Sequence, residues 1–389
     1  MKIKIKFSFA ECAAIEIVLV SLIVIFTILR RSNLISICFA LSFIVLLLYA
    51  IERATLKRYE VCPILLVTVA VVNVLINGLS SSESNMGFDY FKKVIMFSAF
   101  ILMLYFSSED EVTTRSIRII EWAPVGCALL LVGSFFVLGN TSKYGGGITL
   151  GFSNPNFTGM WLLHFSVYTF LFIVKQKGKI ILQLFSFGLF VLLIWLIIQT
   201  KARSCLIGLA LFILLCVVGK ISKAKIVRNK IFIAAIILAP FILVIFYHYL
   251  LNAQWVQRAF ASFVSAGKGL DSRLEVWDPA VKRLEHSFFL GDYSGISNGT
   301  GTSQLHNTHL DVICSYGLCP FLLFLWTLYT VCVKMRDRIS TYSCYCALCG
   351  FLSIIIMGSF EAAVVAGAMG MNILTAGLLI LANEEENRP

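Results

Sequence analysis

The chain has 389 residues, of which 59% are apolar and only 14% are charged, and its formal net charge is +11. Soluble domains carry about a quarter charged residues, so this composition excludes an ordinary soluble domain and indicates an integral membrane protein. The longest polar segment, 252–305, holds equal numbers of acidic and basic residues. The basic excess therefore lies elsewhere, between apolar runs, and we expect no nucleic-acid partner.

The apolar residues form about twelve runs, and most of them can cross a hydrocarbon core ~30 Å thick. Backbone polar groups inside lipid must be satisfied locally, which predicts helices. We therefore expect an all-α integral membrane protein, with about 12 transmembrane helices in one polytopic domain over 1–389. The runs are 10–29, 34–51, 61–79, 90–106, 119–138, 158–174, 180–198, 205–218, 231–251, 310–333, 343–360 and 362–382.

Basic residues predict the orientation of these helices. With Lys2, Lys4 and Lys6 in the cytoplasm, most of the 32 Lys and Arg residues fall in the inside segments. This is the bias that cytoplasmic loops show. It predicts that both termini are cytoplasmic and that 252–305 is a large outer loop before helix 10.

The twelve cysteines lie almost entirely in apolar runs, and 252–305 has none. A disulfide framework is therefore not expected. Cys344, Cys346 and Cys349 have a spacing that metal sites also show, but three small apolar residues packing a membrane helix is the simpler interpretation. We expect neither a metal nor another cofactor.

The first polar constellation on the outer side precedes the short apolar run 205–218. Fourteen residues do not span a bilayer without tilt, so Arg203 is expected below the interface. A charge at that depth is a functional candidate, and the alternative is an anchor whose charged end reaches the interface.

The second constellation lies in the outer loop. Ser272 and Glu275 form a capping box, and the apolar stripe that follows, including Trp277, predicts a short amphipathic helix. Pro279 predicts a kink or a restart. Arg273 falls in the first turn, where the helix dipole disfavours a cation. A cation at this position makes sense if an anion is bound between it and the free N–H groups. The alternative is a solvated Arg paired with Asp271.

The third constellation opens the run 310–333. Thr308 and Asp311 match a capping box, which places His306 just outside the helix. The positive helix end is expected to keep its imidazole neutral, as a general base requires. The alternative for His306, and more so for His309, is an ordinary interfacial polar residue.

Four short strings of this sequence carry a family resemblance: Gly151-Phe-Ser-Asn154-Pro155-Asn156, Thr200-Lys-Ala-Arg203-Ser204, Ser272-Arg273-Leu-Glu-Val-Trp277 followed by Phe288-Phe-Leu-Gly291, and His306-Asn307-x-x-Leu310 leading to Gly317. Together they resemble the bacterial O-antigen polymerase and O-antigen ligase superfamily over roughly residues 140–330. One departure is that the family's usual Gly-x-Gly after the loop helix is here Gly291-Asp-Tyr-Ser-Gly295.

The resemblance implies an inverting glycosyltransferase of helical, C-type architecture that works without a metal at the periplasmic face of the bacterial inner membrane. Its donor and acceptor would be undecaprenyl-pyrophosphate-linked oligosaccharides, with membrane lipid and a chain-length regulator as further partners. Arg203 and Arg273 would bind the diphosphate, and His306 would take the acceptor proton. The remaining expected substrate contacts are Asn307, His309, Asp311, Asn154, Asn156 and Trp277.

Within this resemblance we expect an O-antigen polymerase, which joins undecaprenyl-pyrophosphate-linked repeat units, and two alternatives remain open. An O-antigen ligase would transfer the polymer to lipid A-core and would use the same Arg and His residues. A polysaccharide flippase would place ionisable residues near mid-membrane and often shows inverted repeats. No repeat is visible here, and the polar residues gather on one side.

Overall fold

The computed structural model describes residues 8–31, 84–107, 114–137, 143–144, 146–222, 226–252, 271–291, 305–361 and 369–383, with scattered positions between 33 and 49. These residues are mostly helical. Two short strands, β1 (Lys143–Tyr144) and β2 (Gly147–Ile148), pair as an antiparallel hairpin. The helices are α1 (Phe9–Ile28), α4 (Ser84–Ser107), α5 (Thr114–Phe136), α6 (Pro155–Lys175), α7 (Ile180–Thr200), α8 (Arg203–Ile221), α9 (Lys230–Asn252), α11 (Asp271–Ser287), α13 (Thr308–Tyr316), α14 (Leu318–Asp337), α15 (Tyr342–Met357) and α16 (Met369–Ala382).

Seven of the described helices are long and apolar enough to cross a membrane, and three shorter apolar helices accompany them. The chain is therefore a multi-pass α-helical membrane protein. Of the expected runs, 61–79 lies outside the described residues, and 34–51 is described only at scattered positions. The count of twelve spans stays a prediction.

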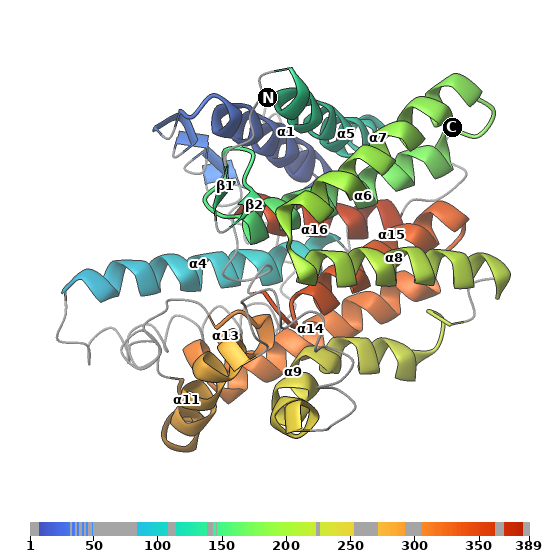
Figure 1. The fold of residues 1–389 in the computed structure, drawn as a ribbon. Coiled ribbons are helices and arrows are strands. Elements are labelled where there is room, and N and C mark those ends of the chain that lie inside the picture. The colour runs from blue at the N-terminus through green and yellow to red at the C-terminus, as the bar shows by residue number, and fades with distance from the viewer. Residues whose placement is uncertain are drawn as a thin grey trace, which may run out of the picture.

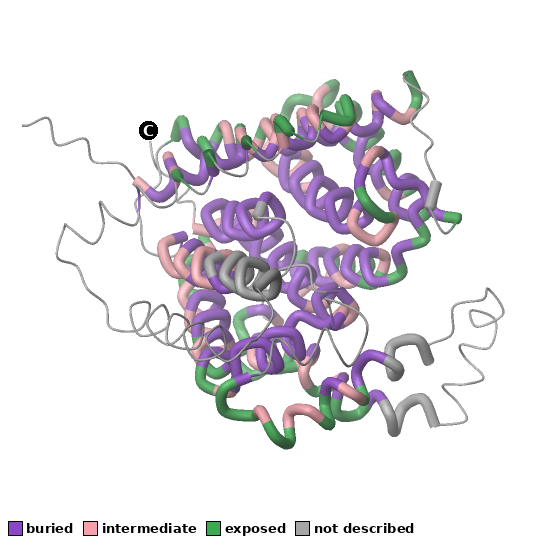
Figure 2. Tube along the Cα trace, turned by 90° about the vertical axis from the view of Figure 1, so that its left-hand side faces the viewer, coloured by how far each residue is buried: buried purple, intermediate pink, exposed green. Residues whose placement is uncertain are grey.

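The core lies where α15 packs against α8, α16 and α6 (Figure 1). The helices in the middle of the bundle are mostly buried (Figure 2). Helix α7 instead alternates buried and exposed apolar residues. An apolar side chain that faces outward in a membrane protein meets lipid, so the exposed side of α7 needs no protein partner. Among the described residues, no group of three or more His, Cys, Asp or Glu side chains is arranged to hold a metal.

Helix α8 corrects the expectation of a fourteen-residue run. It begins at Arg203, directly after the two-residue turn that follows α7, and its 19 residues are enough to span a membrane. The expected run counted apolar residues only, and the helix also includes polar residues at both of its ends. Arg203 is exposed at the first position of this helix. Because the helix is not short, its length gives no reason to place Arg203 below the interface.

The expected span 310–333 is two helices. Gly317 separates α13 from α14 and has a φ of +82°, a left-handed value that glycine adopts without a steric cost. All nine residues of α13 are buried. The region before α14 is therefore a short buried helix whose N-terminal end carries His306.

The amphipathic helix expected in the outer loop is α11. It runs from Asp271 to Ser287 with Pro279 inside it, so the chain does not restart at the proline. The two flanking parts of the expected loop, 253–270 and 292–304, lie outside the described residues.

A close backbone contact holds α11 against the break between α13 and α14. A Cβ on Gly317 would lie 2.2 Å from the Phe289 carbonyl oxygen, and one on Gly291 would lie 2.7 Å from the Gly317 nitrogen. The Leu318 N–H also donates to the Phe288 carbonyl at 2.9 Å. Only glycine allows these two backbone segments to approach so closely, which gives Gly291 and Gly317 a shared structural role.

Candidate functional site

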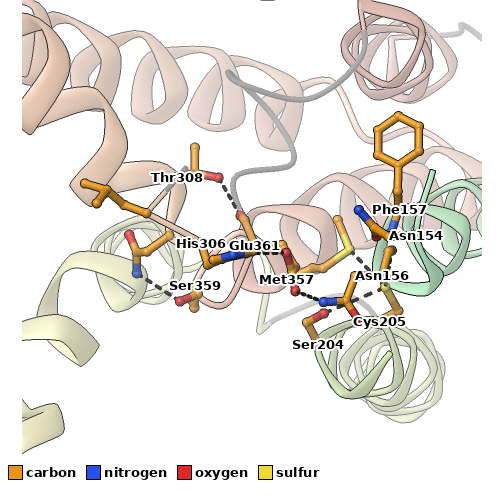
Figure 3. A network of polar contacts seen from close by, with 12 residues as sticks. Asn154, Asn156, Phe157, Ser204, Cys205, His306, Thr308, Met357, Ser359 and Glu361 are labelled. Carbon is orange, nitrogen blue, oxygen red and sulfur yellow. Dashed lines mark hydrogen bonds and ion pairs between the residues drawn. The ribbon is translucent and has the colours of Figure 1, made fainter. Parts of the chain in front are cut away.

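The candidate site is centred on a contact between His306 and Glu361. The His306 Nδ1 lies 3.1 Å from Glu361 Oε2 (Figure 3). The side chain of Glu361 is 6% exposed, whereas that of His306 is 32% exposed. A carboxylate can only accept, so Nδ1 donates, and Nε2 is then the nitrogen with a lone pair in the neutral ring.

The backbone of His306 is fixed by the start of α13. His306 has a φ of +51°, a left-handed conformation that costs about 1–2 kcal/mol in an L-residue. The next residue, Asn307, is the N-cap: its side chain accepts from the Leu310 N–H at 2.9 Å. The expected cap was Thr308; instead the Thr308 hydroxyl donates to the Glu361 carbonyl at 3.0 Å.

Asn307 has its amide fully occupied. Besides capping α13, its Nδ2 donates to the carbonyls of Pro240 and Ser359, each at 2.9 Å, and the residue is buried. It therefore ties α9 and the segment after α15 to the residue that follows His306. The structure gives Asn307 a positioning role in place of the expected contact with substrate.

The second carboxylate oxygen of Glu361 accepts a hydrogen bond from the first turn of α6. Asn156 Nδ2 donates to Glu361 Oε1 at 2.9 Å. Asn154 caps α6 by accepting from the Phe157 N–H at 2.7 Å, and Pro155 occupies the first helical position, where its missing N–H costs nothing. Of the two expected asparagines, Asn156 belongs to the Glu361 cluster and Asn154 forms the helix start that presents it.

The first turn of α8 adjoins the same cluster. The Cys205 thiol lies 4.0 Å from the Asn156 carbonyl oxygen, and a Cβ on Gly159 would lie 2.6 Å from the Ala202 Cβ. This close approach places the N-terminal ends of α6 and α8 together. Arg203 is the exposed first residue of α8. Ser204 and Cys205, which follow it, lie beside Asn156 (Figure 3).

Helix α11 carries the other two expected residues, Arg273 and Trp277. Arg273 lies in its first turn, and the side chain is outside the described part of the chain. The indole of Trp277 is 1% exposed and donates to the Leu305 carbonyl at 2.7 Å. Trp277 therefore fixes the residue before His306 and is not open to a substrate.

His309 and Asp311 lie inside the bundle. His309 is buried, and its ring packs edge-on against Phe321 and Phe324, with centroids 6.0 and 5.4 Å away. Asp311 is also buried, in the first turn of α13. The structure brings His306, Glu361 and Asn156 together, with the first turn of α8, which begins at Arg203, against Asn156. It places His309 in the core instead.

This arrangement suits proton transfer next to an anion. His306 presents Nε2 on a half-exposed ring whose other nitrogen is held by a buried carboxylate. The helices α6, α8 and α13 all begin around this cluster, and helix N-termini carry partial positive charge that favours anions. The cluster thus combines a nitrogen that can take a proton from a hydroxyl with helix ends that favour a negatively charged group.

Glu361 is the site residue that the sequence analysis missed. It follows an apolar run directly, and a carboxylate at such a position is costly without a partner. That cost was a usable signal that a partner exists. Nothing in the local sequence indicated which side chains it would meet.

Comparisons with known proteins add no assignment to this geometry. No protein-family model matches the chain, and no curated protein matches it.

Proposed function

We propose that this protein is a metal-independent inverting glycosyltransferase that joins undecaprenyl-pyrophosphate-linked repeat units into a surface polysaccharide. The observation that carries the proposal is the His306–Glu361 contact, 3.1 Å long, with His306 partly exposed and Glu361 buried. A histidine oriented by a carboxylate is a common general base. The multi-pass helical fold supports a substrate carried on a membrane lipid.

The proposed reaction has one proton transfer and one displacement. His306 Nε2 takes the proton of an acceptor sugar hydroxyl while that oxygen attacks the anomeric carbon of the donor. The bond from this carbon to the diphosphate oxygen breaks, and its electron pair leaves with the lipid diphosphate. Attack opposite the leaving group inverts the anomeric centre. The energy comes from the diphosphate ester itself.

Arg203 and Arg273 are the groups proposed to neutralise the leaving diphosphate. A guanidinium binds phosphate oxygens through two parallel hydrogen bonds and stays charged at all working pH values. Arg203 is the first residue of α8, whose Cys205 contacts Asn156, and Arg273 lies in the first turn of α11. Both therefore belong to helix N-termini, whose partial positive charge adds to theirs.

Deletion of the gene tests the polymerase assignment. We expect cells that still make the lipid-linked repeat unit to carry one repeat unit on the acceptor, without a ladder of longer chains. If long polymer accumulates on undecaprenyl pyrophosphate while lipid A-core stays bare, the protein is the ligase. If lipid-linked units accumulate on the cytoplasmic side, the protein is a transporter.

The proposal places the His306 end of the bundle at the periplasmic face of the inner membrane, with both chain termini in the cytoplasm. The distribution of Lys and Arg supports this orientation. A cysteine introduced at exposed Glu285 should react with an impermeant maleimide in intact spheroplasts, beyond the background from Cys319, the one exposed thiol of the described residues. Reaction only after lysis would reverse the orientation.

A further inference from the structure

Three apolar side chains in the turn after α11 face outward. In this Phe-Phe-Leu turn (Phe288, Phe289 and Leu290), Phe289 is 74% exposed and Leu290 is 53% exposed. Transfer of exposed apolar surface out of water is favourable in proportion to its area. Three consecutive large apolar residues left in water would be a substantial loss, so an apolar medium is expected to cover them.

The turn is held in place by well-defined contacts. Its backbone is fixed by the Gly291–Gly317 approach and by the hydrogen bond from Leu318 to Phe288. These contacts attach the turn to the first residue of α14. The outward direction of its side chains is therefore part of the fold.

The exposed surface continues onto α14, a membrane-spanning helix. Leu322 and Trp326, one and two turns into α14, are 53% and 58% exposed. On a membrane-spanning helix, such apolar side chains meet lipid. Because the Leu318 N–H is hydrogen-bonded to the Phe288 carbonyl, the turn lies at the N-terminal end of α14, the helix that carries these two side chains.

We propose that the Phe-Phe-Leu turn inserts into the bilayer interface at the His306 end of the bundle and anchors the C-terminal end of α11 there. The opposite side of α11 is used within the protein, where Trp277 and Ala280 are buried. Exposed Lys282 and Glu285 give the rest of the helix the polar surface of an interfacial helix. The occupant of the apolar turn is membrane lipid.

Photocrosslinking in native membranes tests this anchor. A p-benzoylphenylalanine residue replaces Phe289 in one variant and Leu290 in a second, so that a folding failure at one position leaves the other. The same residue at Leu322, in α14, is the positive control, and at Glu285, in the last turn of α11, it is the matched polar control. After irradiation, phospholipid adducts are measured by intact-protein mass spectrometry.

We expect lipid adducts at positions 289 and 290 in yields close to that at 322 and at least about fivefold above that at 285. Lipid adducts at 322 without adducts at 289 and 290 would overturn the proposal. Adducts to a second copy of the chain at 289 or 290 would also overturn it, because the turn would then be an interface between protein subunits. Neither result depends on the proposed enzymatic activity.

Discussion

His306 and Glu361 face each other across 55 residues of sequence, with His306 Nδ1 3.1 Å from Glu361 Oε2. Glu361 also accepts from Asn156 through its other oxygen and from Thr308 through its carbonyl. One buried residue therefore joins the starts of α6 and α13. Its position fixes both the ring of His306 and the tautomer that a general base needs.

Replacement of Glu361 by Gln should lower the turnover number by about tenfold to a hundredfold, because the base loses the charge that orients it and stabilises its protonated form. Since the two residues act as one unit, Glu361→Gln should cost less in a His306→Gln background that keeps a measurable rate than it does in the wild type. Glu285→Gln, an exposed change on α11, is the control. Independent, additive losses at 306 and 361 would argue against the pair.

The two histidines should fail in different ways. His306→Ala removes the base and should abolish product while the protein remains inserted and folded. His309→Ala leaves a cavity between Phe321 and Phe324 and should destabilise the fold by about 2 kcal/mol, with little effect on the turnover of protein that folds. Thermal melting in detergent and activity per folded molecule separate these effects; a silent His306→Ala would show that the wrong histidine is assigned.

Lysine in place of arginine tests diphosphate binding. Arg203→Lys and Arg273→Lys keep the charge but lose the planar fork, and each should reduce the rate by about tenfold or more if ~1.4 kcal/mol of transition-state stabilisation is lost. Activity should survive EDTA, because the two guanidiniums take the place of a divalent ion. Full activity of either Ala variant at normal expression would remove that arginine from the proposal.

The glycine contact gives a prediction for stability. Gly317→Ala would bring a Cβ to 2.2 Å from the Phe289 carbonyl oxygen and would place alanine at a φ of +82°. We expect a loss of folded protein corresponding to about 3 kcal/mol or more, from the clash together with the left-handed backbone. Gly133→Ala in α5, where nothing lies within 4 Å of the new Cβ, should be neutral. Equal melting temperatures for both variants would contradict the contact.

The sequence predicted those parts of the fold that depend on local polarity. Runs 158–174 and 180–198 became α6 and α7 with boundaries within three residues, because charged or turn residues end each apolar run. The break at Gly317 was missed because glycine counts as neutral in an apolar run. Its cause is a contact with α11, a segment far away in the sequence.

The sequence predicted only those site residues that lie in a short motif. His306 and Asn156 stand in recognisable strings, but Glu361 is 205 residues from Asn156, so only the packed helices bring them together. The same limit explains Asn307 and Trp277. Each looked available to a substrate in the sequence, yet each is used to bind the backbone of a distant element.

Reconstitution in lipid vesicles tests most directly whether this protein joins lipid-linked repeat units with His306 as the base. The purified protein is placed in lipid vesicles with a chemically defined undecaprenyl-pyrophosphate-linked oligosaccharide, and chain length and released undecaprenyl pyrophosphate are followed by mass spectrometry. We expect the wild-type protein to make chains of two or more units and to release one lipid diphosphate per new bond, and we expect no product from His306→Ala. No elongation by the wild-type protein, or equal elongation by His306→Ala, would contradict it.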